Sequence, residues 1–231
     1  MLQDTMPTIP GQPPLDITLR RSARSRRFSL RVSQLDGRVT LSMPQRAREA
    51  EAMDFARAHE PWLRAALARR PAQALVTMGD RIPVEGRLLT LAPGTSRSPR
   101  IDGDLLLLPG DPAQAAPRTA AFLKTLARDR LAAASDHYAT QLGRTATRLT
   151  LRDTRSRWGS CAHDGALMYS WRLIMAPPEV LSYVAAHEVA HMVQMNHSDA
   201  FWSVVSRLYP HWQTQRKWLH TNGKDLHAYQ F

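Results

Sequence analysis

The sequence contains little cysteine and no long apolar stretch. Cys161 is the single cysteine among 231 residues, which excludes a disulfide within the chain. No run reaches the roughly 18 apolar residues that a membrane-spanning helix needs, so we expect no membrane partner. The first residues, Met1 to Thr5, lack the basic and apolar regions of a signal peptide. Together these absences predict a protein of the reducing cytoplasm.

Lysine is also scarce, although the chain is strongly basic. Lys and Arg number 31 against 20 Asp and Glu, a net charge of +11, and the lysines are Lys124, Lys217 and Lys224. This excess suits an anionic partner such as nucleic acid, nucleotide or acidic protein. A GC-rich genome would produce the same arginine bias, so the placement is more informative than the total. One cluster lies between residues 20 and 31, and a second comprises Arg144, Arg148, Arg152, Arg155, Arg157 and Arg172.

An H-E-x-x-H motif is the most informative feature that the sequence does contain. It runs from His187 through Glu188 to His191, and His197 follows six positions later. Two histidines four residues apart on a helix share one face and can bind a single metal ion. The glutamate then lies against the open position of the metal, where it can take a proton from bound water. The motif therefore predicts a catalytic zinc site in a hydrolase.

The residues before the motif favour a buried helix. Pro177-Pro178-Glu179 is a typical helix start, with proline and an acidic residue in the first turn, and residues 180–186 are mostly apolar. A core helix with two hydrogen-bonded histidines is the alternative interpretation. That helix would bury Glu188 without a compensating charge, which is costly, and a metal removes the objection.

The third metal ligand lies after the motif, where no glutamate occurs. We favour His197, because Asn196 is expected to adopt a left-handed conformation that turns the chain back. Ser198 is then expected to cap a second helix that begins at Asp199. Asp199 is the reserve ligand. The full set of candidates is His197, Asp199, His211, His220, Asp225 and His227.

Several segments of the chain resemble the YgjP-like metallopeptidases, relatives of the SprT-like and WLM zinc proteases. The matching segments are residues 155–161, 169–173, 187–191, 196–198 and 201–202, with 19–24 and 60–63 in the amino-terminal half. The resemblance covers most of the chain and is most specific in the carboxy-terminal third. It implies that His187, His191 and His197 are zinc ligands and that Glu188 is the general base. Nucleotide pyrophosphate hydrolysis has also been proposed for the group.

The order of patterns predicts an α+β fold, with a zincin-like metallopeptidase unit and a mostly β amino-terminal subdomain. Residues 1–14 are rich in proline and polar residues, which predicts a flexible amino terminus. Residues 15–110 form the mostly β amino-terminal subdomain. It is expected to contain a hairpin at 17–42 that turns at Asp36-Gly37 and a helical segment at 44–70 broken near Pro61. Short strands follow, up to residue 108. Residues 111–231 form the catalytic subdomain, with a long helix within 112–142, a strand at 147–151 and a hairpin arm at 166–175.

Arginines near this hairpin are candidates for substrate binding. Arg155, Arg157 and Arg172 can clamp a carboxylate or phosphate, and ion pairs within the protein are an equal alternative. The hairpin at 155–175 is also the natural place for an extended substrate to add as a strand. Cys161 is interpreted as a small buried hydrophobic residue rather than a nucleophile.

Three classes of function follow from these patterns. The first is a zinc metallopeptidase, in which Glu188 accepts a proton from zinc-bound water that attacks a peptide carbonyl. The second is a nucleotide pyrophosphate hydrolase that uses the same zinc site, with the arginines neutralising phosphate charge. The third is a non-catalytic, zinc-stabilised protein that binds nucleic acid through its arginine clusters. An intact Glu188 favours catalysis, because a structural zinc site closes its fourth position with another protein ligand.

Overall fold

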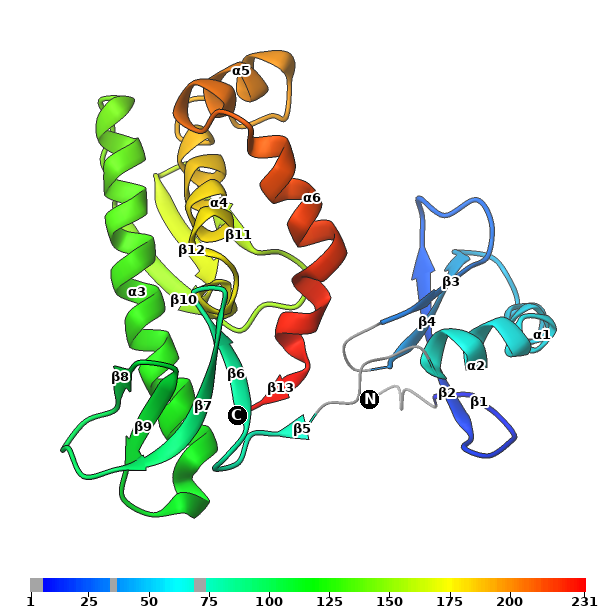
Figure 1. The fold of residues 1–231 in the computed structure, drawn as a ribbon. Helices are drawn as coiled ribbons and strands as arrows, with labels where there is room; N and C mark the ends of the chain where they lie inside the picture. The colour runs from blue at the N-terminus through cyan, green and yellow to red at the C-terminus, as the bar shows by residue number, and fades with distance from the viewer. Residues whose placement is uncertain (1–5, 34–36, 69–73) are drawn as a thin grey trace. The chain divides into compact units, whose positions relative to one another are not determined.

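A computed structural model describes residues 6–33, 37–68 and 74–231 (Figure 1). The chain divides into two compact units, Met1–Ala72 and Gln73–Phe231. Each unit has an apolar core of its own, as the separate clusters of buried side chains indicate. None of the helices in the described ranges is long and apolar enough to cross a membrane.

The first unit contains a four-stranded sheet. Its strands are β1 (Thr8–Ile9), β2 (Leu15–Ser22), β3 (Ser29–Val32) and β4 (Val39–Pro44), in the order β1-β2-β4-β3. β3 and β4 are antiparallel and form the two arms of the expected hairpin, although part of its turn lies outside the described residues. β2 pairs with β4 in parallel, an arrangement that the alternating pattern did not indicate.

Two short helices pack on this sheet, α1 (Glu49–Ala58) and α2 (Glu60–Ala68). The expected break lies at His59, and Pro61 falls in the first turn of α2, where a missing N–H costs no helical hydrogen bond. Residues 6–14, which were expected to be flexible, instead supply β1. Ile9 pairs with Leu15 and is 1% exposed, so its apolar side chain ties this segment to the core.

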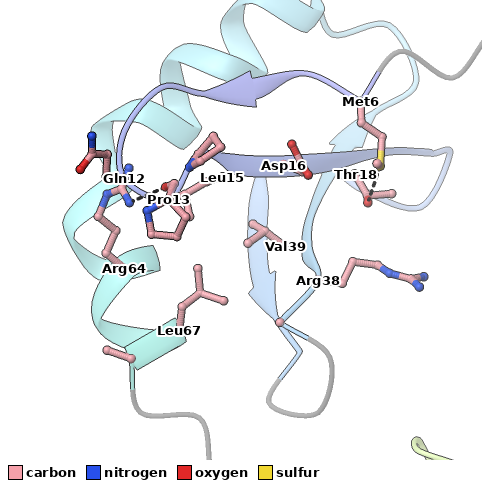
Figure 2. A pocket seen from close by; sticks show the side chains of 13 residues that line it. Met6, Gln12, Pro13, Leu15, Asp16, Thr18, Arg38, Val39, Arg64 and Leu67 are labelled. Atoms are coloured by element: carbon pink, nitrogen blue, oxygen red, sulfur yellow. Dashed lines mark hydrogen bonds between the residues drawn. The ribbon is translucent and has the colours of Figure 1, made fainter. Parts of the chain in front are cut away.

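A cavity of about 890 Å³ lies within the first unit (Figure 2). It is bordered by the loop before β2, the start of β4 and the end of α2. The guanidinium of Arg64 lies at its edge and donates a hydrogen bond of 3.0 Å to the carbonyl oxygen of Pro13. All of its lining residues belong to the first unit, and none belongs to the H-E-x-x-H motif.

The second unit begins with a small sheet that ties its two ends together. β5 (Ala74–Leu75) pairs in parallel with β13 (Tyr229–Gln230). Next come β6 (Arg81–Val84), β7 (Arg87–Gly94), β8 (Arg100–Asp102) and β9 (Leu105–Pro109), in the order β6-β7-β9-β8. Residues 81–109 were expected in the amino-terminal subdomain. They lie in the second unit, because Ile82, Leu89 and Leu106 are buried in its core.

The long helix expected within residues 112–142 is α3 (Ala115–Gln141), which follows the 3-10 turn η1 (Pro112–Gln114). Leu123, Ala127 and Leu131 recur along one face of α3 and are fully buried. Gly143, just past the helix end, has a φ of +61°, a conformation that glycine adopts without strain.

A three-stranded sheet packs beside α3. Its strands are β10 (Arg148–Arg152), β11 (Gly159–Cys161) and β12 (Ala166–Ser170), with β12 in the middle. β11 and β12 are antiparallel, as a hairpin requires, and β10 is parallel to β12. The second arm of this hairpin was expected to extend over residues 166–175, but the strand ends at Ser170. A buried 3-10 helix, η2 (Trp171–Met175), follows it. All five of its residues are buried, and the side chains of Trp171, Leu173, Ile174 and Met175 belong to the core.

The remaining elements are helical. They are α4 (Pro178–Ala190), α5 (Asp199–Leu208), α6 (Trp212–Asn222) and the 3-10 helix η3 (Gly223–His227). α4 lies between α3 and α6 and also contacts α5 and β11 (Figure 1). The H-E-x-x-H motif is thus at the carboxy-terminal end of a helix whose residues are mostly buried in the core of the second unit.

Candidate metal centre

α4 carries the first two histidines of the motif. The helix begins at Pro178, as expected, and ends at Ala190, so that His191 directly follows its last residue. The rings of His187 and His191 have centroids 5.1 Å apart, which places both on one face. The Nδ1 atom of His191 lies 3.0 Å from the carbonyl oxygen of Gln194. A hydrogen bond donated from Nδ1 leaves Nε2 available to bind a metal.

The loop after α4 brings His197 back to the motif. Its Nε2 atom lies 3.1 Å from the Nε2 atom of His187. In a tetrahedral site with metal–nitrogen bonds of about 2.0–2.1 Å, two ligand nitrogens are about 3.3 Å apart. Donor atoms of His187, His191 and His197 all lie within 4.8 Å of one another. The spacing therefore fits three ligands around one metal ion.

The turn that returns His197 differs from the one expected. Positive φ angles among the described non-glycine residues occur at Glu85 and His211, so Asn196 is not left-handed. A tighter turn is made instead, in which the backbone N–H of Ser198 donates to the carbonyl oxygen of Asn196 at 2.8 Å. Ser198 occupies the N-cap position of α5, as expected, but its side chain makes no capping hydrogen bond. Asp199, the reserve ligand, lies outside the three-histidine group.

An aromatic residue of α5 supports all three histidine rings. Phe201 is fully buried, and its ring centroid lies 4.9, 4.4 and 4.8 Å from those of His187, His191 and His197. Trp202 lies 5.7 Å from His187 and 5.9 Å from His197. These contacts limit the rotation of the imidazoles. The sequence pattern did not assign this role to Phe201, although its position one turn after His197 could have indicated it.

Burial favours the neutral form of His187 and His191. Burial lowers the pKa of His187 to about 3, and the nearby His191 and His197 act in the same direction. Burial also lowers the pKa of His191, partly offset by its hydrogen bond to Gln194. Neutral imidazole is the form that binds metals. The Nδ1 atom of His187 is buried and has no hydrogen-bond partner in the described part of the chain.

Glu188 lies against strand β11. Its side chain is buried, with 6% exposure, and it packs over Gly159 so closely that a Cβ at residue 159 would lie 2.5 Å from its Cγ. Burial raises the pKa of Glu188 to about 8, whereas the positive charge of Arg157 lowers it. The contact with Gly159 was not expected, but a glycine within a strand often marks a close approach of this kind.

Arg172 makes its contacts inside the protein. Its guanidinium forms two hydrogen bonds with the Asp153 carboxylate, of 2.7 and 3.1 Å, and donates to the carbonyl oxygens of Leu226 and Tyr229 at 2.9 and 3.0 Å. It also lies 4.7 Å from the ring of Trp171. These contacts favour the structural interpretation of Arg172 over a substrate clamp.

The other three residues considered near the hairpin, Arg155, Arg157 and Cys161, have different surroundings. Arg155 acts electrostatically on Asp153 and His227, where it lowers both pKa values. Arg157 is exposed, and it is the arginine whose charge acts on Glu188. Cys161 is partly buried, and its pKa is raised to about 11 by burial and by the charges of Glu188 and Asp164. It therefore stays a thiol, as expected for a residue that is not a nucleophile.

The second unit is a mixed unit of helices and strands. A buried helix carries the H-E-x-x-H motif, and a third histidine returns to it. This is the arrangement of a zincin-like metallopeptidase. A family model described as YgjP-like, metallopeptidase domain matches residues 26–222. The chain therefore belongs to the YgjP-like metallopeptidase family. Neither the curated proteins nor the solved structures give a match.

Proposed function

We propose that the protein is a zinc-dependent peptidase in which His187, His191 and His197 bind the metal and Glu188 is the general base. The observation that carries the proposal is the convergence of three histidine donor atoms within 4.8 Å, beside a buried glutamate of the same helix. Three imidazole ligands suit zinc and leave one coordination position open, as in catalytic zinc sites. A bound zinc ion supplies Lewis acidity, which acidifies water and polarises a carbonyl group.

The surroundings of Glu188 support a cation in this site. A buried carboxylate is costly unless positive charge lies nearby, and Arg157 is the residue whose charge lowers its pKa. A divalent cation held by the histidines would favour the ionised form more strongly. In that form the Glu188 carboxylate accepts a proton from water and returns it to the leaving amine of the cleaved peptide.

Strand β11 offers a place for an extended peptide. It is an edge strand of its sheet, paired with β12 on one side. Gly159 at its start touches Glu188, so a peptide that adds to the open edge of β11 would pass the proposed base. Main-chain hydrogen bonds to an edge strand would position the scissile bond with little dependence on side chains.

The test is metal analysis together with hydrolysis of an unfolded protein such as casein. We expect about one zinc per chain, and we expect Glu188→Gln to keep its fold and metal but to lose activity by roughly 10²- to 10⁴-fold. Glu179→Gln is the matched control, because Glu179 lies exposed in the first turn of the same helix. Full activity in Glu188→Gln would refute the assignment of the base.

A parallel assay separates the peptidase from a nucleotide hydrolase. Nucleoside triphosphates are offered to the same zinc-loaded preparations, and release of pyrophosphate is measured. We expect none. Release that depends on Glu188, without any cleavage of the unfolded protein, would replace the peptidase proposal.

A further inference from the structure

A groove of about 440 Å³ lies on the three-stranded sheet of the second unit. It is formed by β10, β11, β12 and the segment that leads into β11. The lining residues that matter here are Arg148, Thr150, Arg152, Arg157, Ser160 and Met168.

The groove lies on the face of the sheet that points away from α3. Met168 pairs with Thr150 on one side and with Ser160 on the other, so these three side chains share a face. The neighbouring Tyr169 points the opposite way, into the core, where its hydroxyl lies 3.0 Å from that of Ser135 on α3. Arg148 alternates with Thr150 along β10, so it shares the Met168 face, as does Arg152.

The groove is positively charged. Arg148, Arg152 and Arg157 are exposed, and no carboxylate lines the groove. In the described part of the chain none of these three arginines forms an ion pair, whereas Arg172 beside them is bound to Asp153. Three guanidinium groups held around one groove are a site for anions.

Positive charge continues beyond β10. Arg152 also borders a second cavity, of about 360 Å³, whose lining includes Lys124 and Arg128. The one carboxylate there, Asp153, is engaged by Arg172. An extended anionic ligand that continues past β10 would therefore meet the side chains of Lys124 and Arg128 as well.

Arg157 connects the groove with the proposed base. It lines the groove, and its charge acts on Glu188. Ser160 lines the groove too, and the preceding Gly159 is in contact with Glu188. Gly159 pairs with Tyr169, so Glu188 lies on the core face of the sheet and the groove on the opposite face, with β11 between them.

We propose that this groove is a substrate subsite that binds the carboxylates of acidic residues in a peptide, an inference that rests on the proposed peptidase function. Arg148 and Arg152 lie on β10, at the opposite edge of the sheet from β11, so a peptide reaches them by passing the edge of β11 and continuing across the Met168 face. The lining favours a peptide over a nucleotide, because none of its residues is aromatic and a base would find no ring to stack on. The protein therefore cleaves acidic segments in preference to neutral ones.

Binding is measured on the full-length, zinc-loaded Glu188→Gln variant, so that no cleavage interferes. Two fluorescent peptides of one sequence are compared, one with glutamates and the other with glutamines at the same positions. We expect the acidic peptide to bind about 10-fold more tightly. Adding Arg148→Gln and Arg152→Gln should reduce that preference to about 2-fold or less. Arg81→Gln with Arg97→Gln removes the same charge from exposed positions outside the groove and should leave the preference intact.

The outcomes separate this inference from the proposed function. Arginine-dependent binding of the acidic peptide supports the subsite, even if the wild-type protein proves not to be a peptidase. Equal affinity for the two peptides, or equal losses in the groove and control variants, overturns it. Tight arginine-dependent binding of a nucleoside triphosphate, with no binding of the acidic peptide, overturns it in favour of a phosphate ligand.

The cleavage products give a second measurement. The wild-type protein digests a mixed peptide library, and the residues around each cut are identified by mass spectrometry. We expect Asp and Glu to be enriched at positions near the cut, and the ratio of acidic to neutral sites to fall in Arg148→Gln/Arg152→Gln. Cleavage with no enrichment of acidic residues would overturn the subsite and leave the peptidase proposal standing.

Discussion

The Nε2 atoms of His187 and His197 lie 3.1 Å apart, although the two residues come from different segments on either side of a tight turn. Two ring nitrogens at this distance either share a proton or bind a common metal ion. The ring centroid of the third histidine, His191, lies 4.7 Å from that of His197. A hydrogen bond between His187 and His197 alone would not require a third ring at this place. This arrangement of the three rings fits the proposed ligand set.

We therefore expect His197→Ala to weaken zinc binding by about 100-fold or more, because two imidazoles alone give an incomplete site. Affinity is measured by competition with a chromophoric chelator. His220→Ala is the control, since His220 is exposed on α6 and should keep the wild-type affinity. A His197→Ala protein with tight, stoichiometric zinc would remove His197 from the ligand set.

Gly159→Ala tests the contact between β11 and the proposed base. The new methyl group would lie 2.5 Å from Cγ and 2.6 Å from Oε1 of Glu188, so the glutamate must move. We expect a loss of about 1–3 kcal/mol in the free energy of unfolding and a fall of roughly 100-fold in kcat/KM. Urea unfolding and peptide hydrolysis measure the two effects. Ser160→Ala, on the same strand, adds no bulk and should change neither stability nor the turnover of neutral peptides by a comparable amount.

The sequence was sufficient to predict that His187, His191 and His197 come together, because their geometry is largely local. His187 and His191 are one helical turn apart, and His197 follows within a few residues of the helix end. The start of α4, the long α3 and the break between α1 and α2 were predicted for the same reason. Each depends on side chains that are neighbours in the chain.

Features that depend on contacts distant in sequence were not predictable in this way. Strand order is one: β10 lies parallel to β12, and the strands at residues 81–109 join a core built largely by later helices. Arg172 is another, because its partners include carbonyl groups of residues 226 and 229, more than fifty positions away. A pattern of residue types can indicate that such an arginine has a partner, but not which one.

Arg172→Gln is expected to lower stability rather than to act on the substrate alone. The substitution removes the bidentate pair with Asp153 and leaves two carbonyl oxygens near β13 without their donor. We expect a loss of about 2–3 kcal/mol in the free energy of unfolding and faster hydrogen exchange at the carboxy terminus. Arg144→Gln, at an exposed position, should stay within about 0.5 kcal/mol of the wild type. Unchanged stability with a raised KM would instead assign Arg172 to substrate binding.

His227 should make stability depend on pH. Burial lowers its pKa from 6.5 to about 4, Arg172 and Arg155 act in the same direction, and Asp153 opposes them. Between pH 6.5 and 4 the unfolded chain therefore takes up a proton at this residue while the folded protein does not. Stability from His227 is fully present above pH 6.5 and falls as the pH drops toward 4, by about 1–2 kcal/mol after allowance for solvent screening.

The substitution His227→Phe isolates this contribution, because phenylalanine can keep the contact with Trp158, whose ring centroid lies 5.3 Å from that of His227. Unfolding by urea is followed at pH 7.5 and pH 5. The wild type should lose more stability between the two conditions than His227→Phe. Titration of the proposed metal ligands is common to both proteins and cancels in the comparison. His220→Phe, at an exposed site, should behave as the wild type. Equal losses in the wild type and His227→Phe would mean that His227 titrates alike in the folded and unfolded chains.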